Sequence, residues 1–330
     1  MTTQPGGPDE NRPQGTTIRY RVAQQNESLM MESSRNFRRH PDHLIRGACF
    51  VIASSLMFAM MGGLIKVVSG HLPLVVIVFF RNFFGLLLLS LWLWHTGKVG
   101  LHTHRLHLHG IRTLTGLAAM YCFFFTLGHL HLGEAILLNF TTPLFAPIIA
   151  LFWLGETLPK KMWWAVGLGF AGIILILHPT ESVFAPVALI GLASGMFAAL
   201  AMVSIRSLSH TEPPERIVFY FGAMATLISS LPLLWHWQTP APAEWGALLA
   251  IGILAHLGQL FLTRGYALGP AGQISPFAYS TVVFGSAIGW IVWGERLDGF
   301  SMVGALTVGL AGVLILRMGK SHTPQESQTS

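Results

Sequence analysis

Charged residues are scarce in this sequence. Only 10% of its 330 residues are Asp, Glu, Lys or Arg, whereas 52% are apolar. Because soluble domains contain about 25% charged residues, this composition excludes an ordinary soluble domain. The two cysteines, Cys49 and Cys122, both fall within apolar stretches, so we expect no structural disulfide. The GxxxxGK[ST] motif of nucleotide-binding loops is also absent, so ATP does not drive the chain by itself.

Long apolar stretches fill most of the chain. A helix needs roughly 20 apolar residues to cross the hydrocarbon core of a bilayer. Stretches of about that length occur at 45–67, 73–94, 110–128, 133–154, 162–178, 186–205, 216–235, 245–264, 271–293 and 300–316. The sequence therefore predicts an all-α membrane protein with ten transmembrane helices.

The positive charges are unevenly distributed between the predicted spans. With the N-terminus in the cytoplasm, every Lys and Arg except Lys66, Arg81 and Arg296 falls on the cytoplasmic side, Arg112 included. This bias follows the positive-inside rule, so the net charge of +6 indicates membrane orientation rather than nucleic-acid binding. Residues 1–43 lack the apolar core of a signal peptide and are predicted to be a disordered cytoplasmic tail, and residues 319–330 are predicted to be a second cytoplasmic tail.

The chain contains an internal repeat. Gly155-Glu156 returns as Gly294-Glu295 after 139 residues, and Ile77-Val78-Phe79 returns as Ile217-Val218-Phe219 after 140. We place two five-helix repeats at 44–180 and 181–318. Because each repeat has an odd number of spans, the second enters the membrane inverted. Two inverted halves can rock around a central cavity, which favours a transporter that works by alternating access.

At this level the chain resembles the drug/metabolite transporter superfamily, in its EamA-type branch. The resemblance is carried by the turn Leu154-Gly155-Glu156 and its echo Trp293-Gly294-Glu295, by glycine-rich fifth and tenth spans, by Arg81 and by residues 139–145. It implies a ten-helix transporter of small metabolites in a bacterial inner membrane, with relatives that handle amino acids, nucleotide-like metabolites, vitamins and sugars. One departure is Phe221, which stands where the first repeat has Arg81.

Arg81 is the most informative side chain because it lies near the middle of a predicted span. A charge at that depth costs at least about 2.5–3.5 kcal/mol, so something must compensate it. No Asp or Glu lies deep in any span. Arg81 with its neighbour Asn82 is therefore a candidate counter-charge for a carboxylate or phosphate on a substrate. The alternative is a structural Arg that bonds helix carbonyls or a distant Glu.

Other polar residues complete the candidate site. His256 and Gln259 are three residues apart on one helical face, and His256 is a candidate for proton coupling; the alternative is a hydrogen-bonded packing residue. The predicted fourth and ninth spans are interrupted by proline and bear polar groups, which is typical of binding sites, although such groups also join helices. The predicted substrate-binding set is Arg81, Asn82, Tyr121, Asn139, Thr142, His256, Gln259 and Tyr279.

The loop at 102–109 contains four histidines, but Lys98 and Arg105 beside it oppose a cation, so we predict no metal site. The sequence thus predicts a secondary transporter of amino-acid-like or other small organic anions, with a small-molecule substrate, the bilayer as its environment, no cofactor and no nucleic acid. Nucleotide-like metabolites or vitamins are an alternative cargo. A passive channel and an intramembrane enzyme are weaker alternatives, and a homodimer is left open.

Overall fold

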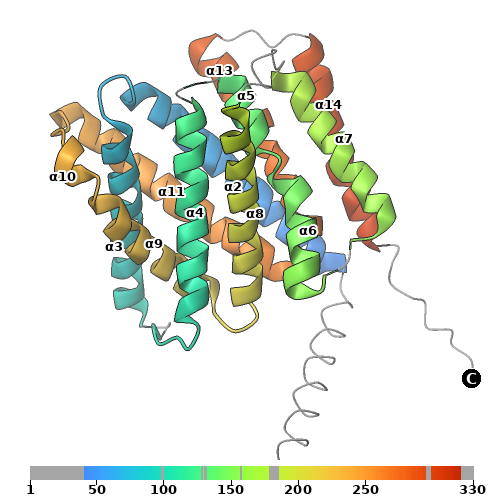
Figure 1. The fold of residues 1–330 in the computed structure, drawn as a ribbon, viewed down its shortest axis with the longest axis horizontal. Helices are drawn as coiled ribbons and strands as arrows, with labels where there is room; N and C mark the ends of the chain where they lie inside the picture. Colours follow the sequence, from blue (N-terminus) through green and yellow to red (C-terminus); the bar gives the residue numbers. More distant parts are fainter. Residues whose placement is uncertain are drawn as a thin grey trace, which may run out of the picture. The chain divides into compact units, whose positions relative to one another are not determined.

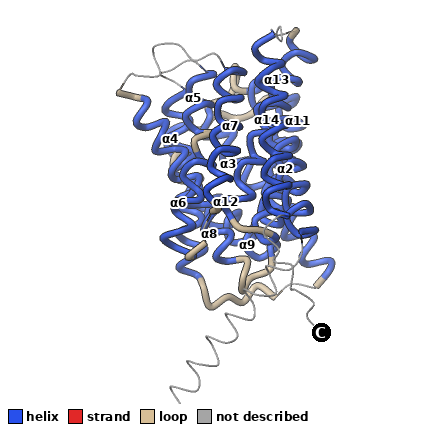
Figure 2. Tube along the Cα trace, turned by 90° about the vertical axis from the view of Figure 1, so that its right-hand side faces the viewer, coloured by secondary structure: helices blue, strands red, loops and turns tan. Residues whose placement is uncertain are grey.

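The computed structural model describes residues 41–97, 100–127, 129, 132–156, 158–177, 186–294 and 299–320. Within these residues it contains helices, turns and loops and no strand (Figure 2). Apart from 41–43 and 319–320, which are helical, the two predicted tails lie outside the described residues.

Uninterrupted helices occupy eight of the predicted spans. They are α2 (Pro41–Val68), α3 (Leu74–Thr96), α4 (Leu106–Leu127), α7 (Lys160–Leu177), α8 (Ala188–Leu208), α9 (Pro214–Ser230), α11 (Pro242–Leu268) and α14 (Gly299–Lys320). A short helix, α10 (Leu233–His236), follows α9. Helix satisfies every backbone polar group within the segment, which is what an apolar stretch in lipid requires.

Length and apolar composition alone qualify six segments of the described chain to cross a membrane. They are His43–Val68, Leu74–His95, Ile136–Leu154, Ala188–Leu208, Pro242–Leu268 and Ala271–Trp293, and Met302–Met318 is a shorter apolar helix. Helices α4, α7 and α9 occupy the remaining predicted spans. The prediction of an all-helical membrane fold with two five-helix repeats is confirmed.

The fourth and ninth spans are both broken. The fourth consists of α5 (Leu132–Asn139) and α6 (Thr142–Leu154), and the ninth of α12 (Ala271–Ile274), the 3₁₀ turn η2 (Ser275–Tyr279) and α13 (Ser280–Trp293). Proline lies in the first turn of α6 and of η2. Because proline cannot donate the helical hydrogen bond and clashes with the preceding turn, the breaks fall where the sequence predicts them.

The repeat is also visible in the backbone conformation. Gly155 and Gly294 end α6 and α13 with φ values of 66° and 67°, in the left-handed region. Gly155 N–H donates to Leu151 O, and Gly294 N–H donates to Trp290 O. Residues with a Cβ rarely adopt this conformation, so the turn needs glycine in both repeats.

Helix packing brings the two repeats into contact. Helix α3 contacts α9 and α11, α4 contacts α8, and α7 lies along α14 (Figure 1). The break between α5 and α6 packs against Gly191 and Gly195 of α8. A Cβ on Gly195 would collide with Thr141 Oγ1 and lie 2.9 Å from Leu138 O, so this small-residue face is needed for close packing.

Polar contacts tie together one end of the helices. Glu156, after α6, accepts hydrogen bonds from Arg206 Nε of α8 and from the Ala271 N–H of α12, both at 2.9 Å. Arg206 Nη1 also donates to Ala267 O at the end of α11, at 3.0 Å. We call Glu156, Arg206, Ala267 and Ala271 the end latch. Through the end latch, Glu156 joins the turn after α6 to α8 and α12. Its counterpart in the second repeat, Glu295, lies outside the described residues.

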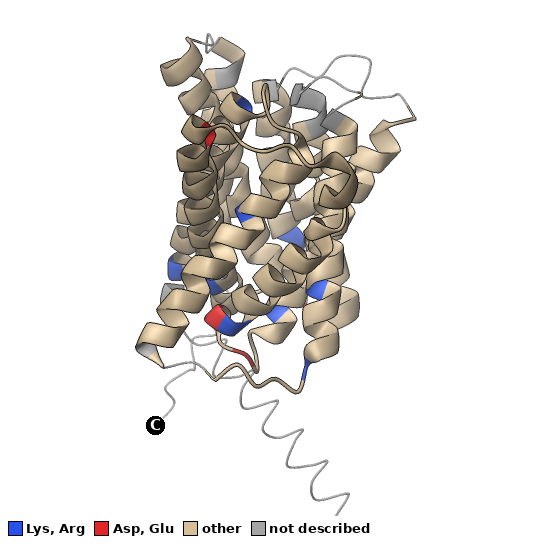
Figure 3. Ribbon diagram, turned by 90° about the vertical axis from the view of Figure 1, so that its left-hand side faces the viewer, with Lys and Arg blue, Asp and Glu red and all other residues tan. Residues whose placement is uncertain are grey.

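A second network lies at the same end. Thr103 Oγ1, in the loop before α4, donates to Glu212 in the loop after α8, and Arg216 pairs with the same carboxylate. Burial by itself raises the pKa of Glu212, but the hydrogen bonds from Thr103 and Arg216 outweigh it and lower the pKa below its usual value. Glu156 bonds Arg206 near the end of α8, and Thr103 bonds Glu212 just after that end. The loops at 100–105 and 155–156 therefore lie at the same end of the bundle. Most Lys and Arg residues also lie toward one end (Figure 3).

Candidate functional site

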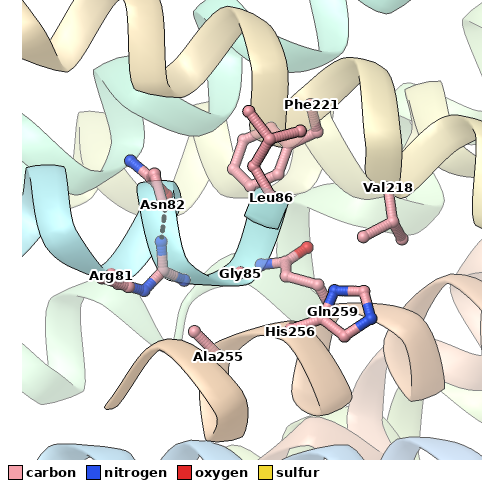
Figure 4. Close-up of a pocket in the computed structure, with 10 residues that line it drawn as sticks. Arg81, Asn82, Gly85, Leu86, Val218, Phe221, Ala255, His256 and Gln259 are labelled. Carbon is pink, nitrogen blue, oxygen red and sulfur yellow. Dashed lines mark hydrogen bonds between the residues drawn. The ribbon is translucent and has the colours of Figure 1, made fainter. Parts of the chain in front are cut away.

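A small cavity lies between α3, α9 and α11 (Figure 4). Its lining residues are Arg81, Asn82, Gly85, Leu86, Val218, Phe221, Gly222, Ala255, His256 and Gln259. The free space is about 20 Å³, enough for a water molecule, whereas metabolite sites usually enclose about 300–1,000 Å³. In this structure the cavity is too small for a metabolite, a state that we call closed, and it could hold one only if the helices around it moved apart.

Arg81 reaches the cavity from α3 and is partly exposed there. Its Nη1 donates to Asn82 Oδ1 at 3.0 Å, as the dashed line in Figure 4 shows. Asn82 is only 5% exposed, and its Nδ2 has no hydrogen-bond partner within the described chain. No ion pair with a carboxylate engages Arg81 among the described residues. Within the part of the chain that the structure describes, neither a distant Glu nor a helix carbonyl compensates this charge.

The structure reveals a second buried arginine beside this cavity. Arg112 of α4 is 3% exposed, its Nη2 donates to Gln259 Oε1 at 2.9 Å, and its guanidinium carbon lies 4.2 Å from the ring centroid of Phe221. Both partners line the cavity. The charge distribution places Arg112 on the cytoplasmic side, so its burial inside the bundle is a difference between the sequence expectation and the structure.

The start of α4 explains the difference. The helix begins at Leu106, and at 1.5 Å per residue Arg112 lies about 9 Å along it. Gly116, one turn further along, leaves room for the guanidinium: a Cβ there would collide with Arg112 Nη1. An Arg followed after four residues by Gly is a signal in the sequence, although a weak one without a known neighbour.

The two arginines give the site a strongly positive character. Arg81 lines the cavity, and Arg112 contacts its wall residues Gln259 and Phe221. Three described glutamates have partners elsewhere: Glu156 with Arg206, Glu212 with Arg216, and Glu215 with Arg264 at 2.6 Å. Two like charges in a closed, low-dielectric site are costly unless an anion joins them. The arrangement is suited to bind an anion.

His256 is the titratable base of the cavity wall. It lies on α11 three residues before Gln259, and the two side chains project from the same helix in Figure 4. It is half-buried, and the described part of the chain provides it with no hydrogen bond or ion pair. Its side chain is thus placed at the cavity rather than in a bonded packing contact.

The other predicted site residues do not line this cavity. Asn139 Nδ2 donates to Ser194 Oγ at 3.1 Å, and Thr142 Oγ1 donates to Gly195 O at 3.1 Å, so both join the broken fourth span to α8. Tyr279 is 1% exposed and contacts Phe140, with ring centroids 6.4 Å apart.

Tyr121 of α4 packs beside Leu117 and Phe221, next to the cavity but not in its wall. Of the predicted set, the structure brings together Arg81, Asn82, His256 and Gln259.

The histidine loop shows no metal-binding arrangement. The rings of His102 and His104 lie 4.5 Å apart, edge to face, but no group of three His, Cys, Asp or Glu side chains that could hold a metal occurs in the described ranges. Thr103, between the two histidines, anchors the loop to Glu212.

The described chain is a helical bundle of two related halves, each with one broken span, and it has a polar cavity between α3, α9 and α11. These features are typical of a class: a multi-pass membrane transporter built from inverted halves. The model of the EamA-like transporter family matches residues 45–178 and again residues 185–318. The chain therefore belongs to the EamA-like transporter family, and it is a transporter of small metabolites rather than an enzyme.

Curated relatives agree with this assignment. The chain is 34% identical over 282 residues to the pseudopaline exporter CntI of Pseudomonas aeruginosa, which spans 84% of this chain and 99% of that protein. It is 25% identical over 289 residues to a riboflavin transporter of Vibrio cholerae, covering 86% and 97% of the two chains. It is 26% identical over 255 residues to an S-adenosylmethionine uptake transporter of Rickettsia felis, covering 76% and 86%.

A crystal structure shares the fold. It superposes with a TM-score of 0.71 over 84% of this chain and 99% of its own, at 18% sequence identity.

Proposed function

We propose that the protein exports a small organic anion across a bacterial inner membrane by alternating access. The observation that carries this proposal is Arg81, a cation in the wall of a closed cavity that no carboxylate within the described chain neutralises. A guanidinium binds a carboxylate through two parallel, charge-assisted hydrogen bonds, which are the strong ones in a water-poor site. A carboxylate on the substrate would offset the cost of keeping Arg81 charged.

The relatives support the direction of transport. The exporter CntI is 34% identical to this chain, whereas the reported uptake transporter for S-adenosylmethionine is 26% identical. Vitamins or nucleotide-like metabolites form the second candidate cargo, since a riboflavin transporter is among the relatives. The positive cavity favours an anionic cargo over a neutral vitamin.

The proposed orientation places both termini in the cytoplasm. The end latch and the loops at 100–105 and 155–156 would then face the cytoplasm, in agreement with the positive-inside rule. Each chain has its own cavity, so the proposal holds for a monomer and for a homodimer.

Counterflow in proteoliposomes tests the function. Wild-type protein should show saturable, trans-stimulated flux of labelled organic acids, which distinguishes a carrier from a passive channel. Arg81→Ala should lower that flux at least about tenfold, because a charge-assisted hydrogen bond contributes about 1.5–3 kcal/mol. Arg46→Ala, the same change at an exposed position of α2, is the matched control and should keep full flux.

The same vesicles test the remaining parts of the proposal. Full flux of organic acids in a folded Arg81→Ala protein would contradict the role of Arg81. We also propose His256 as the proton-coupling residue, and flux that ignores an imposed pH gradient would remove that role. Efflux from preloaded cells, compared with uptake into them, decides whether export is the physiological direction.

A further inference from the structure

We propose that Arg81 and Arg112 bind the substrate together, so that the transporter selects metabolites with two carboxylates over metabolites with one. This inference rests on the proposed function, because it requires that the cavity carries an organic anion. It adds Arg112 as a specificity-determining residue and names dicarboxylates as the substrate class.

The first argument is the charge around one small space. Arg81 lines the cavity, and Arg112 contacts two of its wall residues, Gln259 and Phe221. No described carboxylate pairs with either guanidinium group. One carboxylate would leave a second cation uncompensated inside the bundle, whereas two carboxylates would neutralise the site.

The second argument is the unused hydrogen-bonding capacity. Two guanidinium groups carry ten N–H donors in total. Among the described residues they donate to two side-chain acceptors, Asn82 Oδ1 and Gln259 Oε1. The Nε of Arg112 is buried without a partner, and so is the Nδ2 of Asn82. Buried polar groups in folded proteins are nearly always hydrogen-bonded, so these two donors need an explanation, and a ligand that accepts from them supplies one.

The third argument is that neighbouring residues position the guanidinium group of Arg112, while no described carboxylate forms an ion pair with it. Phe221 supports the face of its guanidinium, and the missing side chain of Gly116 gives it space. Its acceptor, Gln259 Oε1, is neutral and belongs to the cavity wall. A carboxylate accepts from a guanidinium more strongly than an amide does, so we infer that a substrate carboxylate replaces Gln259 when the site opens.

The repeated fold does not require an arginine at the position of Arg81 or of Arg112. At the 140-residue spacing that relates Ile77 to Ile217, the second repeat has Phe221 in place of Arg81 and Gly252 in place of Arg112. Both substituted positions pack well there: Phe221 is 7% exposed, and Gly252 lies close to Phe84 of α3. The two cations come from different helices and bond different acceptors, so each is placed to bind a carboxylate of its own.

The test compares acids that differ by one carboxylate. Suitable pairs are propionate and succinate, alanine and aspartate, and 2-aminobutyrate and glutamate, with glycerol 3-phosphate as the phosphate probe. Counterflow in proteoliposomes and thermal stabilisation of the detergent-solubilised protein are measured for each. We expect the dicarboxylate of at least one pair to be preferred about tenfold or more, in line with one extra charge-assisted bond.

The variants separate the roles of the two arginines. Arg112→Gln should abolish the preference within the pair by lowering dicarboxylate flux more than monocarboxylate flux, and Arg112→Lys should keep part of the preference because the charge remains. Arg81→Gln should lower the flux of both members of the pair. Arg46→Gln, at an exposed position, is the matched control. Size-exclusion profiles confirm folding, and Arg112→Lys carries the test if Arg112→Gln does not fold.

The outcomes distinguish this inference from the proposed function. Equal flux of both acids in every pair, unchanged by Arg112→Gln, would overturn the inference and leave organic-anion transport intact. A preference for glycerol 3-phosphate over every dicarboxylate would also overturn it. No response to any acid would overturn the proposed function, and the inference with it.

Discussion

The end latch predicts a measurable loss of stability in Glu156→Gln. Glu156 receives two hydrogen bonds of 2.9 Å, from Arg206 Nε and from the Ala271 N–H. Arg206 is 4% exposed and the Glu156 side chain 18% exposed, so the pair is largely shielded from water. Glutamine is the same size but neutral, and its amide nitrogen would face one of the two donors.

The magnitude follows from these contacts. Removing one partner of a fully buried ion pair costs about 3–5 kcal/mol. Glu156 is partly exposed, and the remaining glutamine oxygen keeps one of the two bonds, so we expect about 2–3 kcal/mol. For a chain of this length that corresponds to roughly 5 °C in the unfolding midpoint.

Thermal unfolding of the purified protein in detergent measures the effect. Glu244→Gln is the matched control: Glu244 accepts a hydrogen bond from the Ala241 N–H at the start of α11, at an exposed site, so its loss should cost under about 1 kcal/mol. Arg206→Lys should fall between the two, because lysine keeps the charge but cannot bond Glu156 and Ala267 O together. If Glu156→Gln and Glu244→Gln shift the midpoint equally, the assignment of the latch as a stabilising contact is wrong.

Two further predictions concern packing and pH. Gly195→Ala should destabilise the protein by about 1–3 kcal/mol, because the added Cβ would collide with Thr141. Gly167→Ala is the control and should be neutral or stabilising, because its Cβ would meet no atom within 4 Å. Thermal unfolding midpoints compare the two variants. The pKa of Glu212 is lowered in the folded state, so its contribution to stability is present above the usual pKa of about 4.5 and is lost as the pH falls through the lower folded value. The midpoint should therefore drop on acidification below about pH 4.5 and do so less in Glu212→Gln; the same drop in both proteins would refute the assignment.

Local patterns were sufficient for the architecture. Apolar length predicts each span, because lipid admits only segments that satisfy their own backbone. The break in the fourth span follows from Pro143, and the paired turns at Gly155 and Gly294 follow from the repeat itself. Arg81 stands out for the same kind of reason, since a charge in mid-span is conspicuous without any knowledge of its neighbours.

The partners of polar residues could not be predicted in this way. Asn139 and Thr142 look equally suited to face a substrate or a neighbouring helix, and only the packing of α8 against the break shows that they bond Ser194 and Gly195. Arg112 is the clearest case. Near a span boundary an arginine is normally assigned to the headgroups, and its burial depends on helices far away in the sequence.

The sequence by itself determined that this chain crosses the membrane as two related halves, because hydrophobic length and a 140-residue repeat are properties of the chain alone. Only the tertiary structure decided which charges meet. Gln259 bonds Arg112 across 147 residues of sequence, and Phe221 supports it from a third helix. Such encounters depend on how α4, α9 and α11 pack together, which no local pattern encodes.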